Sequence, residues 1–295
     1  MLRSGHLAIL LAFFLPIASV CADALTVEGT PKKSSLSFKK ERRTPPDISD
    51  IPLDTLTGKY RDRTIEILNK PVSWIEGRRE MFPCHQELLE WLIDHPDAVG
   101  EYWKQLGISV IDVERTEDGY VCHDPSGSTV YFHVVSSQPN MRVCYCIGES
   151  PAGILPFKMR AELVIVHRFK FEQVDGAGTY ISQKLDGFAT AAGPTLKLAM
   201  KLAPGQAEEM VDSCVQEMKV FFSVMCRLMQ LRAQWSLEKL PAVTKNIPED
   251  EKKDLENILT SLPPAPHAPI VIRRSDSTPI VEKVATKPEE EATKK

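Results

Sequence analysis

Residues 210–229 read MVDSCVQEMKVFFSVMCRLM, and this stretch decides the fold that we expect. Apolar residues recur in it every three or four positions, which is the spacing of one face of an amphipathic α-helix. The apolar face starts just before this stretch and consists of Ala207, Met210, Val211, Cys214, Met218, Phe221, Phe222, Met225 and Met229. If it extended from Gln206 to Glu238, the helix would be about 50 Å long, and its apolar face would need an equally long apolar partner.

The partner that the sequence offers is a β-sheet. Between residues 108 and 189, six segments alternate in the period of two that is typical of β-strands. They are 108–115, 119–124, 128–136, 141–148, 160–173 and 178–189. The breaks between them are short and turn-like, which predicts antiparallel pairing because parallel strands need long crossovers.

The strand at 160–173 shows which face the helix would cover. One of its faces is apolar except for one histidine and is formed by Ala161, Leu163, Ile165, His167, Phe169 and Phe171. The other face becomes charged at Arg168 and Lys170. The pattern also predicts a strand at 72–82 and two short helices at 84–93 and 97–106. The expected fold class is α+β, with an antiparallel sheet of about six or seven strands and a long C-terminal helix.

This order of elements resembles the START-like superfamily, also called SRPBCC or helix-grip proteins. The local sequence EGRREMFPCHQELLEWLIDHPDAVGEYWKQLGISVIDVE is similar to the opening of that family, with Pro83, Trp91, Asp94 and Trp103 at the matching positions. The resemblance covers roughly residues 70–238, and its motifs are loose. It implies a sheet wrapped around the C-terminal helix, with a deep cavity between them that holds an apolar ligand. The family has no fixed catalytic signature, so the resemblance implies no catalytic residue.

Nine residues form the expected ligand-binding site between sheet and helix. They are His167, Phe169, Ile165, Ile181, Gln183, Met210, Met218, Phe221 and Met225. Methionine side chains are flexible and polarisable, so they suit a wall that adapts to varied apolar shapes. The same methionines are also compatible with ordinary core packing, and His167 with a hydrogen-bonded core histidine. Both interpretations stay open.

The N-terminus has the pattern of a secretory signal peptide. Arg3 precedes an apolar run from Leu7 to Val20, and small residues follow, with cleavage expected after Ala22 or Ala24. We therefore expect an exported protein, either periplasmic or secreted. Removal of the signal leaves six of the seven cysteines, and the sequence does not decide how they pair.

Composition divides the chain into four parts. They are the signal peptide at 1–22, a disordered linker at 23–58, a START-like domain at 59–240, and a tail at 241–295 that is rich in proline and charge. Within the tail, one short helix is expected at 250–262. The basic segment 32–43 is a candidate for peripheral contact with an anionic membrane.

The sequence favours binding over catalysis. The formal net charge is −4, which gives no indication of nucleic-acid binding. None of the common nucleotide-binding, zinc-protease or serine-hydrolase motifs is present in the sequence, and we expect no cofactor and no metal site. The function expected is binding or carriage of a lipid or other apolar small molecule. The alternatives are a cyclase- or hydrolase-type enzyme that uses the same cavity with His167 as acid or base, and a cell-envelope scaffold with a solid core. The oligomeric state stays open.

Overall fold

The computed structural model describes residues 44–107, 111–125, 127–151, 158–174, 178–202 and 204–262. The predicted signal peptide, the basic segment 32–43 and residues 263–295 of the expected tail lie outside these ranges. Among the described helices, none is long and apolar enough to span a membrane.

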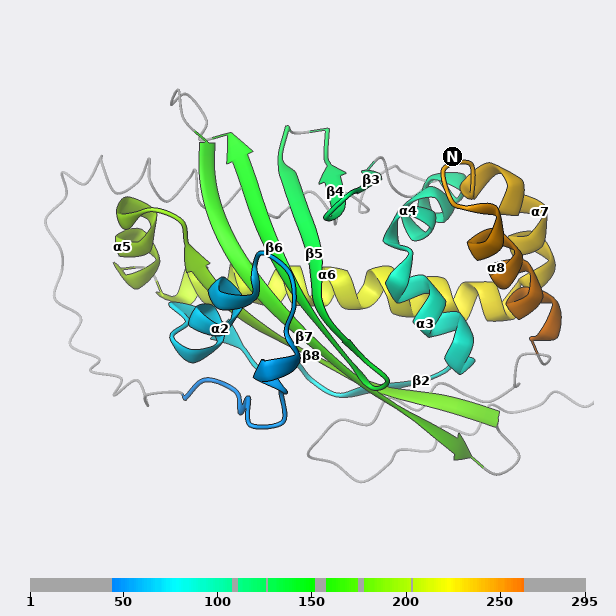
Figure 1. Cartoon of the computed structure of the whole chain (residues 1–295), viewed down its shortest axis with the longest axis horizontal. Coiled ribbons are helices and arrows are strands. Elements are labelled where there is room, and N and C mark those ends of the chain that lie inside the picture. The colour runs from blue at the N-terminus through cyan, green and yellow to red at the C-terminus, as the bar shows by residue number, and fades with distance from the viewer. Residues whose placement is uncertain are drawn as a thin grey trace, which may run out of the picture.

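An eight-stranded antiparallel sheet forms the centre of the fold (Figure 1). Its strands are β1 (Ser73–Ile75), β2 (Glu80–Pro83), β3 (Asp112–Thr116), β4 (Gly119–His123), β5 (Thr129–Gln138), β6 (Met141–Pro151), β7 (Lys158–Val174) and β8 (Gly178–Ala191). Their order is β1-β8-β7-β6-β5-β4-β3, and β2 also pairs with β8. The α+β class and the antiparallel pairing are confirmed.

The sheet has one strand more than expected because the segment 72–82 forms two strands. Between β1 and β2 the chain passes Gly77, whose backbone N–H donates a hydrogen bond of 3.0 Å to the buried carboxylate of Asp186. A Cβ at Gly77 would lie 1.7 Å from the carbonyl oxygen of Leu185, so only glycine fits at this close approach. The interruption of the strand therefore follows from backbone packing that the alternation of side chains does not reveal.

The helices are distributed over both faces and one end of the sheet. They are the short 3₁₀-helix η2 (Leu53–Thr55), α2 (Arg61–Asn69), α3 (Gln86–Asp94), α4 (Pro96–Gln105), α5 (Pro194–Leu202), α6 (Pro204–Leu231), α7 (Ala233–Val243) and α8 (Glu249–Ser261). The single helix expected from 206 to 238 is wrong, because the backbone leaves the helical conformation at Arg232, where φ is −133° and ψ is 50°.

The first half of α6 packs on one face of the sheet. Met210, Val211, Cys214 and Val215 share a buried cluster with side chains of β6, β7 and β8. The helix packs tightly at Gly187 on β8, where an added Cβ would lie 2.7 Å from a methyl group of Val211. The glycine thus lets the helix backbone approach the sheet.

The opposite face of the sheet is covered by the N-terminal segment. Ile51, Leu56 and the α2 residues Ile67 and Leu68 are buried against β6, β7 and β8. The sheet residues in this cluster include Val164 and Val166, from the strand face that was expected to become charged. The packed part of the chain therefore starts well before residue 59.

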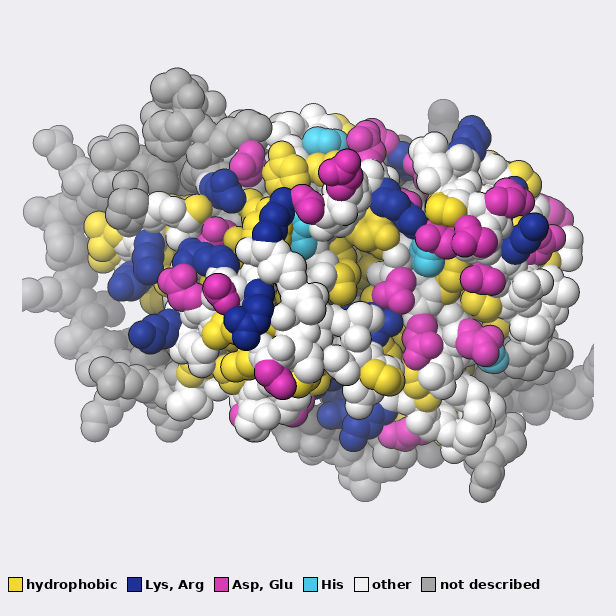
Figure 2. All heavy atoms as spheres, in the orientation of Figure 1, with side chains coloured by type: hydrophobic (Ala, Val, Ile, Leu, Met, Phe, Trp, Pro, Cys, Tyr) yellow, Lys and Arg dark blue, Asp and Glu magenta, His cyan; other side chains and the backbone are white. Residues whose placement is uncertain are grey.

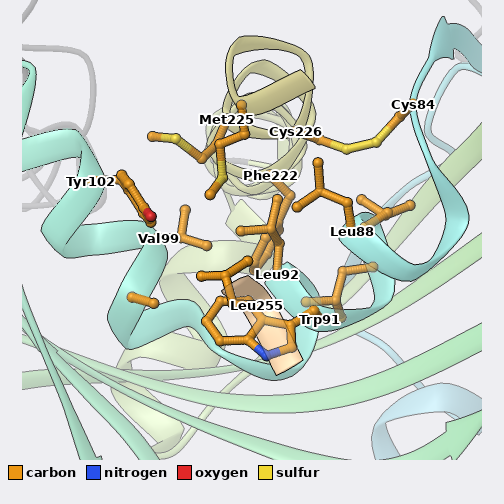
Figure 3. Close-up of a cluster of buried hydrophobic side chains, with 14 of the residues drawn as sticks. Cys84, Leu88, Trp91, Leu92, Val99, Tyr102, Phe222, Met225, Cys226 and Leu255 are labelled. Carbon is orange, nitrogen blue, oxygen red and sulfur yellow. A yellow bond between two sulfur atoms is a disulfide. The ribbon is translucent and has the colours of Figure 1, made fainter. Parts of the chain in front are cut away.

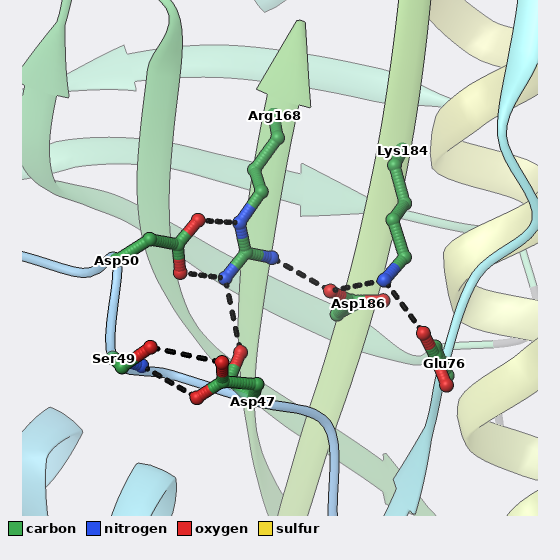
Figure 4. Close-up of polar contacts among 7 residues, drawn as sticks. All are labelled: Asp47, Ser49, Asp50, Glu76, Arg168, Lys184 and Asp186. Carbon is green, nitrogen blue, oxygen red and sulfur yellow. Dashed lines mark hydrogen bonds and ion pairs between the residues drawn. The ribbon is translucent and has the colours of Figure 1, made fainter.

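Arg168 binds the N-terminal segment to this face (Figure 4). Its guanidinium donates two hydrogen bonds to Asp50, at 2.6 and 2.7 Å, and one of 2.6 Å to Asp186 on β8. Lys184 lies 3.4 Å from the same Asp186 carboxylate and 2.8 Å from Glu76. Burial nevertheless raises the pKa of Asp186 above its ordinary value.

The second half of α6 packs against helices rather than strands. Figure 3 shows Phe222 and Met225 of α6 among side chains of α3 and α4, with Leu255 of α8 on the same cluster. Cys226 of α6 forms a disulfide with Cys84, two residues before α3. Because Leu255 and Leu259 are buried here, the packed part of the chain also extends beyond residue 240.

Candidate functional site

A cavity of about 130 Å³ lies between α6 and the strands β3 to β7. Its lining is almost entirely apolar and consists of Pro96, Ile111, Val113, Tyr120, Cys122, Asp124, Ser128, Val130, Phe132, Cys146, Leu163, Ile165, Cys214, Glu217, Met218, Phe221 and Phe222. Cys146, Ile165 and Phe222 are buried, whereas Tyr120, Val130 and Met218 are half-buried. The cavity thus has a buried inner wall and a rim that is nearer to solvent.

Glu217 is the acidic group on the inner wall. The residue is only 7% exposed, and its Oε1 accepts a hydrogen bond of 3.0 Å from the hydroxyl of Ser213, one turn earlier on α6. Its Oε2 is buried and has no hydrogen-bond partner. Burial raises the pKa of Glu217 to about 7, and the bond from Ser213 offsets this in part. Close to neutral pH, this carboxyl group therefore changes between its charged and neutral forms.

Three free thiols also line the cavity. They belong to Cys122 on β4, Cys146 on β6 and Cys214 on α6. Burial raises the pKa of Cys122 to about 12 and those of Cys146 and Cys214 well above their ordinary value. These thiols stay protonated at neutral pH, so they act as apolar wall and not as nucleophiles. Among the residues that the structure describes, no group of three His, Cys, Asp or Glu side chains is placed to hold a metal ion.

The cavity lies between α6 and the sheet, and only some of the nine predicted residues line it. Ile165, Met218 and Phe221 line it. Met210 lines a smaller void of about 20 Å³, which also borders Cys146, Leu163 and Cys214. The other five, which pack elsewhere, are His167, Phe169, Ile181, Gln183 and Met225.

These five residues do not line this cavity, so their placement at a ligand stays a prediction. Ile165 and Phe169 lie on the same face of β7, yet Ile165 packs with the first half of α6 and Phe169 packs with the cluster of α3, α4 and the second half of α6. Met225 is part of that second cluster and is fully buried. A long strand that runs past a helix meets different partners at its two ends, and periodicity alone does not separate them.

His167 belongs to a buried polar pair. Its Nε2 lies 3.0 Å from Oε1 of Gln183 on β8, and the amide nitrogen of Gln183 lies 3.3 Å from Glu80 on β2. Burial lowers the pKa of His167 to about 4, so the ring is neutral at physiological pH. With Nε2–H donating to Gln183, Nδ1 is left without a partner in the buried pair. This arrangement matches the alternative of a hydrogen-bonded core histidine.

Glu217 was missed because its charge placed it on the polar side of the helix. Its position gives the signal that could have found it, since it lies three residues after Cys214 and four before Phe221. Both of these residues belong to the apolar face, so helical geometry places Glu217 between them. A single acidic residue inside an apolar helical face is a candidate for a buried functional group.

The face of the molecule drawn in Figure 2 is mixed in charge. Figure 2 shows Lys and Arg interspersed with Asp and Glu on the face drawn, and hydrophobic side chains in a hollow near its centre.

No protein-family model matches the sequence, and a search of the curated proteins found no match.

Proposed function

We propose that this chain is an exported START-like binding protein that holds a small apolar molecule between its sheet and α6. The single observation that carries the proposal is the cavity of about 130 Å³, whose wall is apolar except for a few polar groups. Ligand sites typically combine an apolar lining with a small number of polar groups that orient the ligand. In this cavity, Glu217 has that role.

The packing of α6 supports a helix-grip arrangement. The buried residues of its first half share a cluster with β6, β7 and β8. The cavity lies between the same helix and the strands β3 to β7. Leu163 and Ile165 on β7 contribute to both. The disulfide between Cys84 and Cys226 supports export, because disulfides persist mainly in oxidising compartments.

Binding is better supported than catalysis. The thiols in the wall have raised pKa values, and His167, the acid or base considered for a cyclase or hydrolase, is not among the lining residues. A scaffold with a solid core is disfavoured by the cavity itself.

The size of the cavity limits the ligand. Engineered apolar cavities of about 150 Å³ bind benzene, whereas sites for drug-sized ligands occupy roughly 300–1,000 Å³. The ligand is therefore a compact molecule of about the size of one aromatic ring, or the end of a longer apolar chain. A larger ligand would fit only if Met218 and the other half-buried side chains at the rim moved.

Binding of toluene to the full oxidised chain tests the proposal. We expect saturable binding in ligand-observed NMR and an increase in the melting temperature. Val130→Trp and Met218→Trp each place a large side chain in the cavity wall and should abolish both effects. Val134→Trp is the matched control, because Val134 is on the same strand, is 37% exposed and does not line the cavity. Equal binding by all four proteins, or no binding by the parent chain, would refute the proposal.

A further inference from the structure

We propose that the ligand of this cavity is an organic amine, bound as a cation, with a compact apolar body. This inference rests on the proposed binding function. It names the chemical class of the ligand from two features of the wall: an unpaired acidic group and a set of aromatic rings.

The first feature is the charge of the wall. Glu217 and Asp124 are the acidic residues among those that line the cavity, and none of the described lining residues is Lys, Arg or His. The remaining titratable groups are one tyrosine and three thiols. Burial raises the pKa values of Tyr120 and Cys122 to about 12 and those of Cys146 and Cys214 well above their ordinary value. These groups are neutral at pH 7. Any charge in the lining is therefore negative.

Two basic residues on the elements around the cavity, Lys219 and Arg115, are paired with other acidic residues. Lys219, two positions after Glu217 on α6, has its Nζ 3.8 Å from Glu80. Arg115 on β3 pairs with Asp97 at 3.3 Å and Glu251 at 2.9 Å. Ser213 supplies the hydrogen bond to Oε1 of Glu217, and Oε2 has none. A buried carboxylate without a counter-ion is costly, and a bound ammonium group would provide both the charge and the missing donor.

The second feature is the aromatic part of the wall. The rings of Tyr120 and Phe132 are tilted against each other with centroids 6.3 Å apart, and Phe221 and Phe222 make an edge contact at 5.1 Å. All four residues line the cavity. Aromatic faces attract cations through the ring quadrupole, so these rings favour the charged head of an amine as well as its apolar body.

Other ligand classes fit less well. An organic anion would be repelled by Glu217 and would find no cationic partner among the described lining residues. A neutral alcohol or ketone would gain the apolar contacts but would leave the charged form of Glu217 unpaired. Because burial raises the pKa of Glu217 to about 7, a neutral ligand should bind better in acid and an amine better in base.

A series of four compounds of one shape tests the proposal on the full oxidised chain. Toluene, benzyl alcohol, benzylamine and benzoate share one ring and differ in the group attached to it. At about pH 8, we expect benzylamine to bind about tenfold or more tightly than benzyl alcohol, because hydrogen bonds to charged groups are the stronger ones. Lowering the pH to about 5 should reduce the affinity for benzylamine as Glu217 takes up a proton, and should increase that for benzyl alcohol.

Two variants test whether the preference for benzylamine depends on the carboxyl group of Glu217. In Glu217→Gln, the ratio of the benzylamine and benzyl alcohol affinities should fall to near one and should no longer depend on pH. Glu209→Gln removes an exposed acid from the same helix and should keep the parent ratio. An amine preference that survives Glu217→Gln, or that is missing in the parent chain although toluene binds, overturns this inference alone. If none of the four compounds binds, the proposed function fails as well.

Discussion

Cys84 and Cys226 are 142 residues apart in the sequence, and their disulfide joins the start of α3 to the second half of α6. Their Cα atoms are 6.3 Å apart. Phe222 lies one turn before Cys226 and belongs both to the buried cluster of the α3 end and to the wall of the cavity. The disulfide therefore fixes the part of α6 that closes one side of the candidate site.

Removal of the disulfide should destabilise the protein. In the double variant Cys84→Ala/Cys226→Ala, the closed loop of the unfolded chain is lost, and we expect the free energy of unfolding to fall by about 2–5 kcal/mol in urea denaturation. A reducing agent should lower the stability of the parent chain and leave the double variant unchanged. Equal stability with and without reductant in the parent chain would contradict the prediction.

Loss of Arg168 should release the N-terminal segment from the sheet. Arg168→Gln leaves Asp186, which is 1% exposed, with Lys184 as its remaining cationic partner, so we expect a loss of about 2–4 kcal/mol in urea denaturation. Asp50→Asn is the matched comparison on the exposed side of the same network, since the Asp50 side chain is 52% exposed. That change should cost about 1 kcal/mol or less. A larger loss in Asp50→Asn than in Arg168→Gln would contradict the prediction that the buried contact with Asp186 dominates.

Glu217 should make stability depend on pH in an unusual direction. Its pKa is about 7 in the folded chain, against an ordinary value of 4.5, so the folded state binds more protons than the unfolded state between these values. Stability contributed by this group is therefore greatest in acid and falls as the pH rises to about 7. Glu217→Gln should remove that slope and be more stable than the parent chain by about 2–3 kcal/mol above pH 7. Glu209→Gln should keep the slope of the parent chain.

The periodicity of the sequence predicted the positions of the helices and strands better than it predicted which segments pack against them. The strands from β4 to β8 and the helices α3, α4 and α8 lie within a few residues of their expected positions. The helix α2 was missed, and so was the packing of residues 44–58, because the apolar residues there are few and widely spaced. Ile51 and Leu56 nevertheless cover Val164 and Val166 on the sheet. The local sequence pattern does not show that an isolated apolar residue will pack against residues far away in the sequence.

The sequence indicated the region of the candidate site, but only some of the residues that line it. The apolar faces of α6 and β7 indicated the region between them, and Ile165, Met218 and Phe221 are there. The strands β3 to β5 supply much of the wall, including Val130 and Phe132, and their inward faces were not assigned from the sequence. How far along a strand the helix stays in contact depends on sheet twist and helix direction, which are properties of the assembled fold.

His167 gives a final test, which separates a core histidine from a ligand-binding one. Its pKa is about 4 in the folded chain, against an ordinary value of 6.5, so the unfolded state binds more protons between these values. Its contribution to stability is therefore present above about pH 6.5 and is lost as the pH falls to 4, by about 3 kcal/mol in total. His167→Gln should lack this acid-dependent loss in urea denaturation, and its affinity for toluene should equal that of the parent chain because the residue does not line the cavity. An imidazole that titrates near its ordinary pKa in NMR would show that the pair with Gln183 is open to water. A loss of toluene binding in a stably folded variant would instead place His167 at the ligand.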